Sequence, residues 1–572
     1  MASQTKPPVK PVSSPNPLPP ALWAAAKAWL AQDPDSGTRA ELTDLLAAAG
    51  AGDAAALAEL TDAFAGPLTF GTAGLRAALG PGPGRMNRVV VTQAAAGFAD
   101  WLLHEGGVAP GASILIGYDA RHKSAVFARD SAEVMAGLGL TPLLADGPIP
   151  TPVLAFGVVQ LGCAAGVQVT ASHNPAQDNG YKVYLGDGSQ IIPPVDAQIA
   201  AHIASRAARP LHDIARSSDY RSAGTELIDA YVARAAGLIG PDEPRDVTWA
   251  YTAMHGVGAQ TVQRLVAAAG LPTPAIVEAQ INPDPDFPTV PFPNPEEPGA
   301  MDLVIALAQA RGADIAIATD PDADRCAVAV PVAGRWRRLT GDEVGALLGD
   351  DALRRGVPGT FAASVVSSTL LGRMAEANGR VFAKTLTGFK WIGRVPGLGF
   401  GYEEAIGYCC DPAAVRDKDG ISATAVLLRL TAGLKAQGLT VADRLDEIDR
   451  RYGVHATAQH SLRVAQISQI AAMMKRLRAA PPAELAGEKV TVSDLQAPGG
   501  ELPPTDAVEF SGPTVHVVVR PSGTEPKLKC YCEARRPAEE AGRNLVASRA
   551  AAALTLENLW AEIEQVLAPP KM

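Results

Sequence analysis

Short apolar runs alternate along this chain with longer stretches whose apolar positions recur at helical spacing. The apolar runs are bounded by turn residues and predict strands at Ser113–Asp119, Gly166–Thr170, Val247–Thr252, Asp314–Thr319, Thr360–Val366 and Val515–Val519. Helical spacing predicts helices over Gln260–Ala269, Glu343–Arg355 and much of Ala21–Leu60. Strands that alternate with helices in this way predict an α/β fold with largely parallel or mixed sheets.

Breaks in this pattern divide the chain into an arm and several domains. A chain of 572 residues is long enough for three or four domains. The Pro-rich residues 1–20 predict a disordered arm. We expect domains over residues 21–225, 226–335, 336–455 and 456–572. Two further Pro-rich segments, residues 283–298 and 480–504, are predicted to be long loops.

Composition excludes several classes of protein. The formal net charge of −10 argues against nucleic acid or an anionic membrane surface as the main partner, so an anionic substrate must be held by local basic clusters. The apolar runs are shorter than the roughly 18 residues of a membrane span, and the first ten residues lack the apolar core of a secretory signal. Six cysteines without a CxxC pair are too few for a disulfide scaffold. We expect a cytoplasmic protein.

Three aspartates follow one predicted strand at alternate positions, Asp320, Asp322 and Asp324. Carboxylates on one short loop suit Mg²⁺, and a bound cation would relieve the repulsion between them. The spacing resembles a calcium-binding EF-hand loop, but Arg325 and Pro331 stand where that loop requires glycine and glutamate. The alternative is a solvated acidic turn.

A second loop, Thr170-Ala-Ser172-His173-Asn174-Pro175, also comes at the end of a predicted strand. A serine before a turn-forming Asn-Pro is expected to point outward rather than to pack, which is where a nucleophile would sit. Lys182 is close enough in sequence to return to this loop and move protons. The alternatives are a turn capped by its own side chains and a surface lysine.

Two more loops carry groups that suit a sugar and a phosphate. Glu403 and Glu404 form a carboxylate pair whose oxygens are able to accept hydrogen bonds from adjacent sugar hydroxyls, or they form an exposed acidic turn. The segment Arg520-Pro-Ser522-Gly523-Thr524 follows a Val-rich strand and places an arginine, two hydroxyls and a glycine amide in one turn. Such a turn predicts a phosphate site, with a surface turn as the alternative.

Together these loops resemble the motifs of the α-D-phosphohexomutase superfamily, which includes phosphoglucomutases and phosphomannomutases. The matching segments are residues 170–175, 320–325 and 520–526, with further agreements at Phe70–Arg76, Gly117–Arg121, Met254–Gly258 and Thr387–Ile392. The resemblance extends from about Phe70 to Glu533 in the order of the family. It implies four domains around a central cleft, of which three are similar α/β domains and the last is a smaller α+β domain.

The resemblance also implies a mechanism and a set of site residues. Ser172 would carry a phosphoryl group, and Mg²⁺ would be held by Asp320, Asp322, Asp324 and an oxygen of the phosphoserine. A sugar 1-phosphate would place its phosphate at Arg520, Ser522, Gly523 and Thr524, and its free hydroxyl would attack phosphoserine to give a sugar bisphosphate. Glucose 1,6-bisphosphate would activate the enzyme by phosphorylating Ser172. The remaining implied roles are proton transfer by Lys182 or His173, contact of Arg76 with phosphoserine or the reacting phosphate, and a part for Arg325 in the cluster that holds the metal and the substrate. Lys390 would contact the sugar or the phosphate, and Glu403 would contact the sugar.

One departure from the family pattern affects the choice of sugar. The common sugar loop of the family has a serine where this chain has Ala405, so one hydroxyl contact is missing. This version resembles a branch of phosphoglucomutases, phosphopentomutases and sugar-bisphosphate synthases, and glucose is the expected sugar, with ribose or mannose phosphates as alternatives. A phosphatase and a non-catalytic sugar-phosphate sensor are the competing functions. The expected partner is a small phosphosugar.

Overall fold

The computed structural model describes residues 19–72, 74–464, 467–522 and 527–568. The arm predicted for residues 1–20 lies outside the described residues up to residue 18, and Pro20 already begins a helix. The predicted helical stretch Ala21–Leu60 consists of three helices, α1 (Pro20–Gln32), α2 (Ser36–Gly50) and α3 (Ala54–Ala63). Asp35 and Asp53 divide them, because each side chain accepts hydrogen bonds from the first backbone N–H groups of the next helix.

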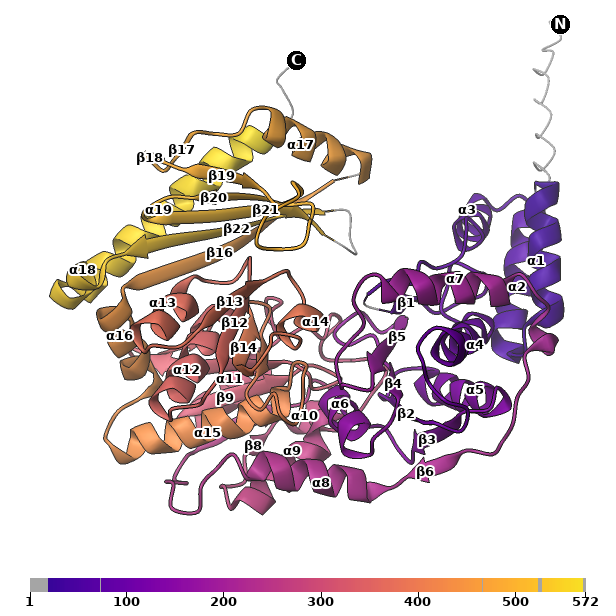
Figure 1. Cartoon of the computed structure of the whole chain (residues 1–572), viewed down its shortest axis with the longest axis horizontal. Coiled ribbons are helices and arrows are strands. Elements are labelled where there is room, and N and C mark those ends of the chain that lie inside the picture. The colour runs from indigo at the N-terminus through magenta and orange to yellow at the C-terminus, as the bar shows by residue number, and fades with distance from the viewer. Residues whose placement is uncertain (1–18, 73, 465–466, 523–526, 569–572) are drawn as a thin grey trace, which may run out of the picture.

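The first domain is a six-stranded mixed sheet between helices (Figure 1), in the order β1-β5-β4-β2-β3-β6. Its strands are β1 (Leu75–Ala78), β2 (Ser113–Tyr118), β3 (Thr141–Ala145), β4 (Ala165–Val169), β5 (Asp178–Leu185) and β6 (Arg221–Ala223). Its helices are α4 (Arg88–His104), α5 (Ser124–Gly137), α6 (Thr151–Gln160) and α7 (Val195–Ala207), with a 3-10 turn at Leu211–Asp213.

The side chains of β2 point alternately to the two faces of the sheet, and this explains how the sheet packs against the rest of the molecule. Ile114 and Ile116 point to one face and belong to the core of the first domain, with α4 and α5. Leu115 points to the other face and belongs to a core that continues through the second and third domains. The first three domains therefore share buried apolar surface, which fixes the loops of one domain against those of the next.

The second and third domains are also mixed sheets. The second has β7 (Trp249–Thr252), β8 (Ala275–Ile276), β9 (Ile315–Thr319), β10 (Cys326–Val332) and β11 (Arg335–Arg338), with α8 (Thr225–Ala236), α9 (Gly258–Ala269), α10 (Glu278–Ile281) and α11 (Asp302–Arg311). The third has β12 (Thr360–Ser364), β13 (Phe382–Thr385), β14 (Leu398–Glu403) and β15 (Gly407–Cys409), with α12 (Gly341–Arg354), α13 (Leu370–Ala377), α14 (Phe389–Ile392), α15 (Gly420–Ala436) and α16 (Val441–Tyr452).

The last domain has an antiparallel sheet in the order β16-β22-β21-β20-β19, covered by the long helix α19. The strands are β16 (Val454–Arg463), β19 (Thr491–Asp494), β20 (Val508–Ser511), β21 (Val515–Pro521) and β22 (Lys527–Arg536), with a separate pair β17 (Glu484–Leu485) and β18 (Glu488–Lys489). The helices are α17 (Ile467–Ala479), α18 (Ala538–Arg543) and α19 (Leu545–Leu567). Each described helix is too short or too polar to cross a lipid bilayer.

The predicted fold class is confirmed, with three mixed α/β sheets followed by a C-terminal domain. The predicted strands occur within a few residues of their expected positions, as in β2, β4 and β9. The Pro-rich residues 283–298 hold no helix or strand, as expected. The prediction of a long loop over residues 480–504 is wrong, because short strands pair there, including β19 with β20.

Candidate active site

The four candidate segments occupy equivalent positions, since each connects two antiparallel strands. The serine loop (residues 170–177) joins β4 to β5, and the aspartate loop (residues 320–325) joins β9 to β10. The glutamate loop (residues 404–406) joins β14 to β15, and the C-terminal loop (residues 522–526) joins β21 to β22. Each of the first three contains one non-glycine residue with positive φ, namely Ser172 (51°), Ala323 (56°) and Ile406 (53°). Gly523 and Thr524 lie outside the described residues.

Ser172 is buried, and its hydroxyl faces the second domain. The residue is 3% exposed, and its Oγ donates to Asp320 Oδ2 at 2.7 Å and lies 3.2 Å from His173 Nδ1. The expectation that this serine points outward is therefore wrong. The sequence placed it correctly at a strand end, but it gave no sign that the aspartate loop, 148 residues away, would cover it.

His173 and Arg76 complete this side of the site. The His173 side chain is 16% exposed, and burial together with Arg325 and Arg76 holds the pKa of its imidazole well below the usual value. Arg76 comes from β1, and its Nη1 donates to Asn174 Oδ1 at 3.0 Å. The neutral form of the imidazole is thus favoured next to the serine hydroxyl.

Arg121 fixes the backbone of the serine loop. Its Nη2 donates to the carbonyl oxygens of Ser172 at 2.6 Å and Asn174 at 2.5 Å, and its Nη1 donates to that of Pro175 at 2.8 Å. From the sequence, Arg121 was noted only as part of a match to the family. A sign was present, because Arg121 follows β2, and β2 is the parallel neighbour of β4.

The three aspartates converge in the interior. One carboxylate oxygen of each lies within 4.8 Å of those of the others, and all three residues are buried. Asp320 Oδ1 accepts from the Arg325 backbone N–H at 3.0 Å. Among the described residues, Oδ1 of Asp322 and Oδ1 of Asp324 have no hydrogen-bond partner. Buried carboxylate oxygens without donors fit a divalent cation, which would satisfy them.

Two glycines allow other segments to approach the aspartate loop closely. A Cβ on Gly256 would lie 2.3 Å from the Pro321 Cα, and a Cβ on Gly420 would lie 2.2 Å from the Arg325 carbonyl oxygen. The Gly256–Pro321 approach is reinforced by a hydrogen bond from the Val257 N–H to the Pro321 carbonyl at 2.8 Å. The loop is therefore held by backbone on two sides.

Two lysines and a threonine surround the aspartates. Lys182 Nζ lies 2.6 Å from Asp322 Oδ2 and 2.9 Å from Asp324 Oδ2, and Lys418 Nζ lies 3.4 Å from Asp324 Oδ2. Burial opposes ionisation of Asp324, but the two lysines hold the pKa of that carboxyl below its usual value. Thr151 Oγ1 also donates to Asp322 Oδ2 at 2.6 Å. Neither Lys418 nor Thr151 was among the residues that the sequence indicated.

The two glutamates of the third domain take different directions. Glu404 Oε2 accepts from the hydroxyls of Ser364 at 3.0 Å and Ser367 at 3.2 Å. Glu403 is 7% exposed, and burial raises the pKa of its carboxyl although Lys418 and Arg325 oppose this. The Ala405 carbonyl accepts from Arg325 Nη1 at 2.9 Å, so the aspartate and glutamate loops are joined.

Cationic side chains from the third and fourth domains face each other near the C-terminal loop. Arg520 in β21 pairs with Lys529 in β22, and the Ser522 N–H donates to the Lys527 carbonyl at 2.9 Å. Lys390 in α14 contacts the Thr72 hydroxyl of the first domain. Burial lowers the pKa of the Lys390 ammonium, and the charge of Arg520 lowers it further. Several cationic side chains therefore gather near this loop, which favours an anionic ligand.

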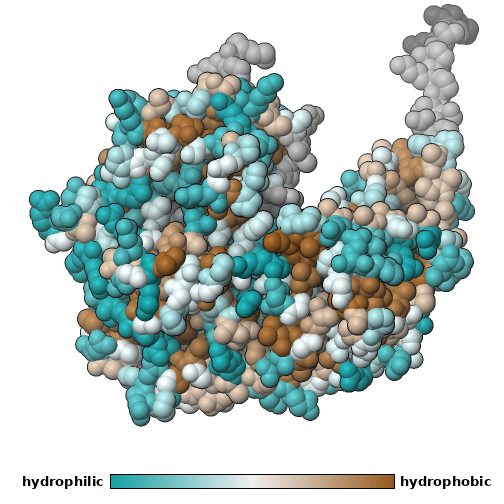
Figure 2. Space-filling view, in the orientation of Figure 1, coloured by the Kyte–Doolittle hydropathy of each residue, from teal (hydrophilic) through white to brown (hydrophobic). Residues whose placement is uncertain are grey.

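A cavity of about 850 Å³ lies where the four domains meet. Figure 2 shows the surface hollowed between the C-terminal domain and the first domain. All four domains contribute to the lining, with Arg76 and His173, then Asn294, Glu296 and Arg325, then Asp342, Glu404 and Ala405, and finally Ser522, Lys527 and Lys529. The other predicted site residues within the described chain do not line this cavity, namely Ser172, Lys182, Lys390, Glu403, Arg520 and the three aspartates.

Comparisons with known proteins agree with this arrangement. Models of phosphoglucomutase/phosphomannomutase domains I, II and III and of the C-terminal domain match residues 67–210, 229–333, 340–452 and 461–550. A probable phosphomannomutase of Haemophilus influenzae is 48% identical, with 79% of this chain and 93% of the relative covered. A probable phosphoribomutase of Schizosaccharomyces pombe is 37% identical, with 90% and 94% covered. The crystal structure of a putative phosphomannomutase from Thermus thermophilus superposes with a TM-score of 0.66 at 25% identity, covering 85% and 99%.

Proposed function

This chain belongs to the phosphoglucomutase/phosphomannomutase family, whose members are isomerases that transfer phosphate intramolecularly, and we propose that Ser172 is the residue through which it transfers phosphate. The reaction interconverts a sugar 1-phosphate and a sugar 6-phosphate through a phosphoserine and a sugar bisphosphate. The observation that carries this proposal is the position of the Ser172 hydroxyl. It donates to the Asp320 carboxylate and lies next to His173, which lines a cavity shared by all four domains.

Asp320, Asp322 and Asp324 are proposed to hold Mg²⁺ with an oxygen of phosphorylated Ser172. The donor set fits, because hard carboxylate oxygens converge and two of them have no hydrogen-bond donor among the described residues. When bound, Mg²⁺ would neutralise charge on the transferring phosphoryl group. Lys182 and Lys418 lie next to Asp322 and Asp324, and their positive charges balance part of the negative charge of the aspartate loop.

Arg520, Ser522, Gly523 and Thr524 are proposed to hold the phosphate that is not being transferred, with Lys529 opposite Arg520. Binding there leaves the free hydroxyl of the sugar near Ser172. That hydroxyl loses its proton as it attacks phosphoserine, and the neutral form of His173, favoured by burial, makes its imidazole a candidate acceptor. Burial opposes the charge of Lys182, but Asp322 and Asp324 raise the pKa of its ammonium above the usual value, so Lys182 is the candidate proton donor for the reverse transfer. Arg76 and Arg325 line the cavity beside the serine and aspartate loops, where they would bind the moving phosphate.

Glucose 1-phosphate is the proposed substrate, with Glu403, the backbone of Ala405 and Lys390 at the sugar. Glucose 1,6-bisphosphate is the proposed activator, because it would phosphorylate Ser172. The second candidate is a pentose phosphate, favoured by a relative that covers 90% of this chain and is named a probable phosphoribomutase.

The test is a coupled assay of glucose, mannose and ribose 1-phosphates with Mg²⁺ and glucose 1,6-bisphosphate, with inorganic phosphate measured in parallel. We expect conversion to the isomeric phosphate without phosphate release, and its loss in Ser172→Ala. Ser131→Ala removes a buried hydroxyl that donates to the Phe127 carbonyl within α5, and this control should remain active. Release of inorganic phosphate would instead indicate a phosphatase, and the absence of any turnover would favour a sensor.

A further inference from the structure

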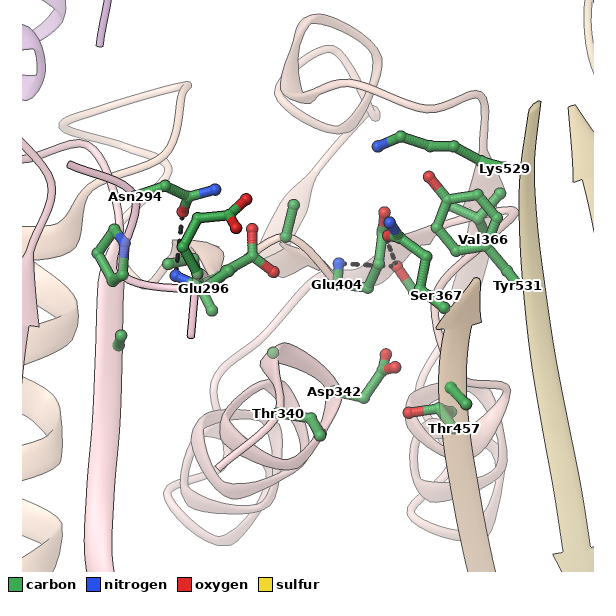
Figure 3. A pocket seen from close by; sticks show the side chains of 18 of the residues that line it. Asn294, Glu296, Thr340, Asp342, Val366, Ser367, Glu404, Thr457, Lys529 and Tyr531 are labelled. Atoms are coloured by element: carbon green, nitrogen blue, oxygen red, sulfur yellow. Dashed lines mark hydrogen bonds between the residues drawn. The ribbon is translucent and has the colours of Figure 1, made fainter. Parts of the chain in front are cut away.

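The proline-rich loop of the second domain contributes a carboxylate to the cavity that the sequence did not single out. The loop is rigid at this point. Asn294 is 8% exposed, and its Oδ1 accepts from the Glu296 N–H at 3.0 Å. Arg338 Nη1 donates to the Pro295 carbonyl at 2.8 Å. Glu296 is thereby held from both sides, and Figure 3 shows its side chain entering the space between Asn294 and Glu404.

The Glu296 carboxylate is surrounded by cations but remains accessible. Its side chain is 36% exposed, and Arg325 Nη1 lies 3.5 Å from Oε2, at the outer limit of a hydrogen bond. Burial in the concave surface raises the pKa of the carboxyl, while the charges of Arg325, Arg338 and Lys529 oppose that rise. An incoming group can therefore bind both oxygens without breaking a short ion pair.

Glu403 and Glu404 are more constrained than Glu296. Glu404 already accepts the hydroxyls of Ser364 and Ser367. Glu403 is 7% exposed and does not line the cavity among the described residues. Ala405 offers a methyl group, and its carbonyl is taken by Arg325. The same guanidinium thus contacts the glutamate loop and lies next to Glu296, so the two share one partner in the cavity wall.

We propose that Glu296 is a specificity-determining residue whose carboxylate accepts hydrogen bonds from two neighbouring ring hydroxyls of the sugar phosphate. This inference rests on the proposed function. A carboxylate has two acceptor oxygens, and it favours substrates that present two hydroxyls at matching spacing. A sugar whose hydroxyls do not match leaves one oxygen desolvated without a donor, which weakens binding. Glu296 should therefore discriminate between hexose and pentose phosphates.

The competing role is positioning of Arg325. If Glu296 acts only by its charge on that guanidinium, every sugar phosphate should lose the same factor when the charge is removed, because all of them carry the same phosphate. If Glu296 contacts hydroxyls, the losses should differ between sugars, because their hydroxyl patterns differ. The ratio of kcat/KM between two sugars separates the two roles.

The experiment compares wild type, Glu296→Gln and Glu296→Asp with glucose, mannose and ribose 1-phosphates. Glutamine keeps the size but replaces one acceptor oxygen with a donor, and aspartate keeps the charge but withdraws both oxygens by one methylene. We expect kcat/KM for the preferred sugar to fall about tenfold or more in each variant, and the ratio between glucose and ribose phosphates to shift about fivefold or more. Glu278→Gln is the matched control, because Glu278 is an exposed carboxylate of the same domain, and it should leave both values unchanged.

Two results would overturn the inference while the proposed function stands. One is an equal loss of kcat/KM for all three sugars in Glu296→Gln, together with the wild-type ratio between sugars in Glu296→Asp. That result would mean that Glu296 positions Arg325 and does not contact the sugar. The other is wild-type behaviour of both variants. A wild-type enzyme that converts none of the three sugars would instead contradict the proposed function. Thermal melting of each variant confirms that the comparison is made on folded protein.

Discussion

At the scale of single residues, the aspartate loop brings three buried carboxylates next to the Lys182 ammonium. Asp322 shares one oxygen between Lys182 and Thr151 and leaves the other without a donor among the described residues. We expect Asp322→Asn to raise the Mg²⁺ concentration needed for half-maximal activity at least tenfold, because one anionic ligand is lost. Titration of activity with Mg²⁺ measures this, and full activity of the wild type in excess chelator would contradict the role of the metal.

Asp342 gives a residue-scale prediction that depends on pH. Burial raises the pKa of its carboxyl to about 6, although the Ser368 N–H and the Tyr402 hydroxyl donate to it. The folded pKa is above the usual 3.8, so the folded state binds the proton more tightly. The charged carboxyl therefore costs about 3 kcal/mol of stability above pH 6, and this cost disappears as the pH falls towards 4.

Asp342→Asn tests this account of the pH dependence. The variant should have a higher denaturation midpoint than wild type at pH 7.5, and the difference should shrink at pH 4.5. Asp302→Asn, which changes an exposed aspartate in the first turn of α11, is the control. A difference between Asp342→Asn and wild type that is the same at both pH values would be evidence against the shifted carboxyl.

At the scale of elements, the N-terminus of α13 is attached to the last domain by one carboxylate. Glu533 of β22 accepts from Ser368 Oγ at 2.6 Å and from the Thr369 N–H at 2.9 Å, and it lies 3.1 Å from His455 Nδ1. Burial opposes its ionisation, but the bond to His455 lowers the pKa of the carboxyl to about 2. The contacts of the charged carboxyl together contribute about 3 kcal/mol, which is present above pH 4.5 and is lost as the pH falls through 2.

We expect Glu533→Gln to loosen the last domain from the third at neutral pH. Limited proteolysis near the boundary between α16 and β16 should be faster in this variant, and its melting temperature should fall by several degrees. Glu539→Gln, on the exposed side of α18, should behave as wild type. An unchanged cleavage rate in Glu533→Gln would remove Glu533 from the contact between the two domains.

The sequence predicted the hairpin loops well, because each loop follows a short apolar strand and carries residues that are rare together. Asp320–Asp324 and the serine loop were found in this way. No role was predicted for Arg121, Lys418 or Glu296, because each acts on a loop that is distant in sequence or belongs to another domain. The burial of Ser172 was missed for the same reason. Local patterns predict elements, whereas contacts between domains require the fold.

At the scale of the whole molecule, the equivalent loops of four sheets meet around one cavity. The phosphate site that we propose in the last domain would bind a group that every sugar phosphate carries. We expect Arg520→Ala to lower kcat/KM for glucose, mannose and ribose 1-phosphates by a similar factor. The loss should correspond to at most a few kcal/mol of binding free energy, about that of one set of charge-assisted hydrogen bonds. Arg543→Ala in α18 changes an exposed arginine and is the control. A loss confined to one sugar would assign Arg520 to sugar recognition instead.

The central claim is that phosphate passes through Ser172, and it is tested by following that phosphate. The protein is treated with glucose 1,6-bisphosphate, its peptides are mapped by mass spectrometry, and the phosphorylated protein is then mixed with glucose 1-phosphate. We predict phosphate on the peptide that contains Ser172 and its transfer to the sugar at a rate no slower than turnover. Phosphate on another residue, or full turnover by a protein that is never phosphorylated at Ser172, would contradict the account.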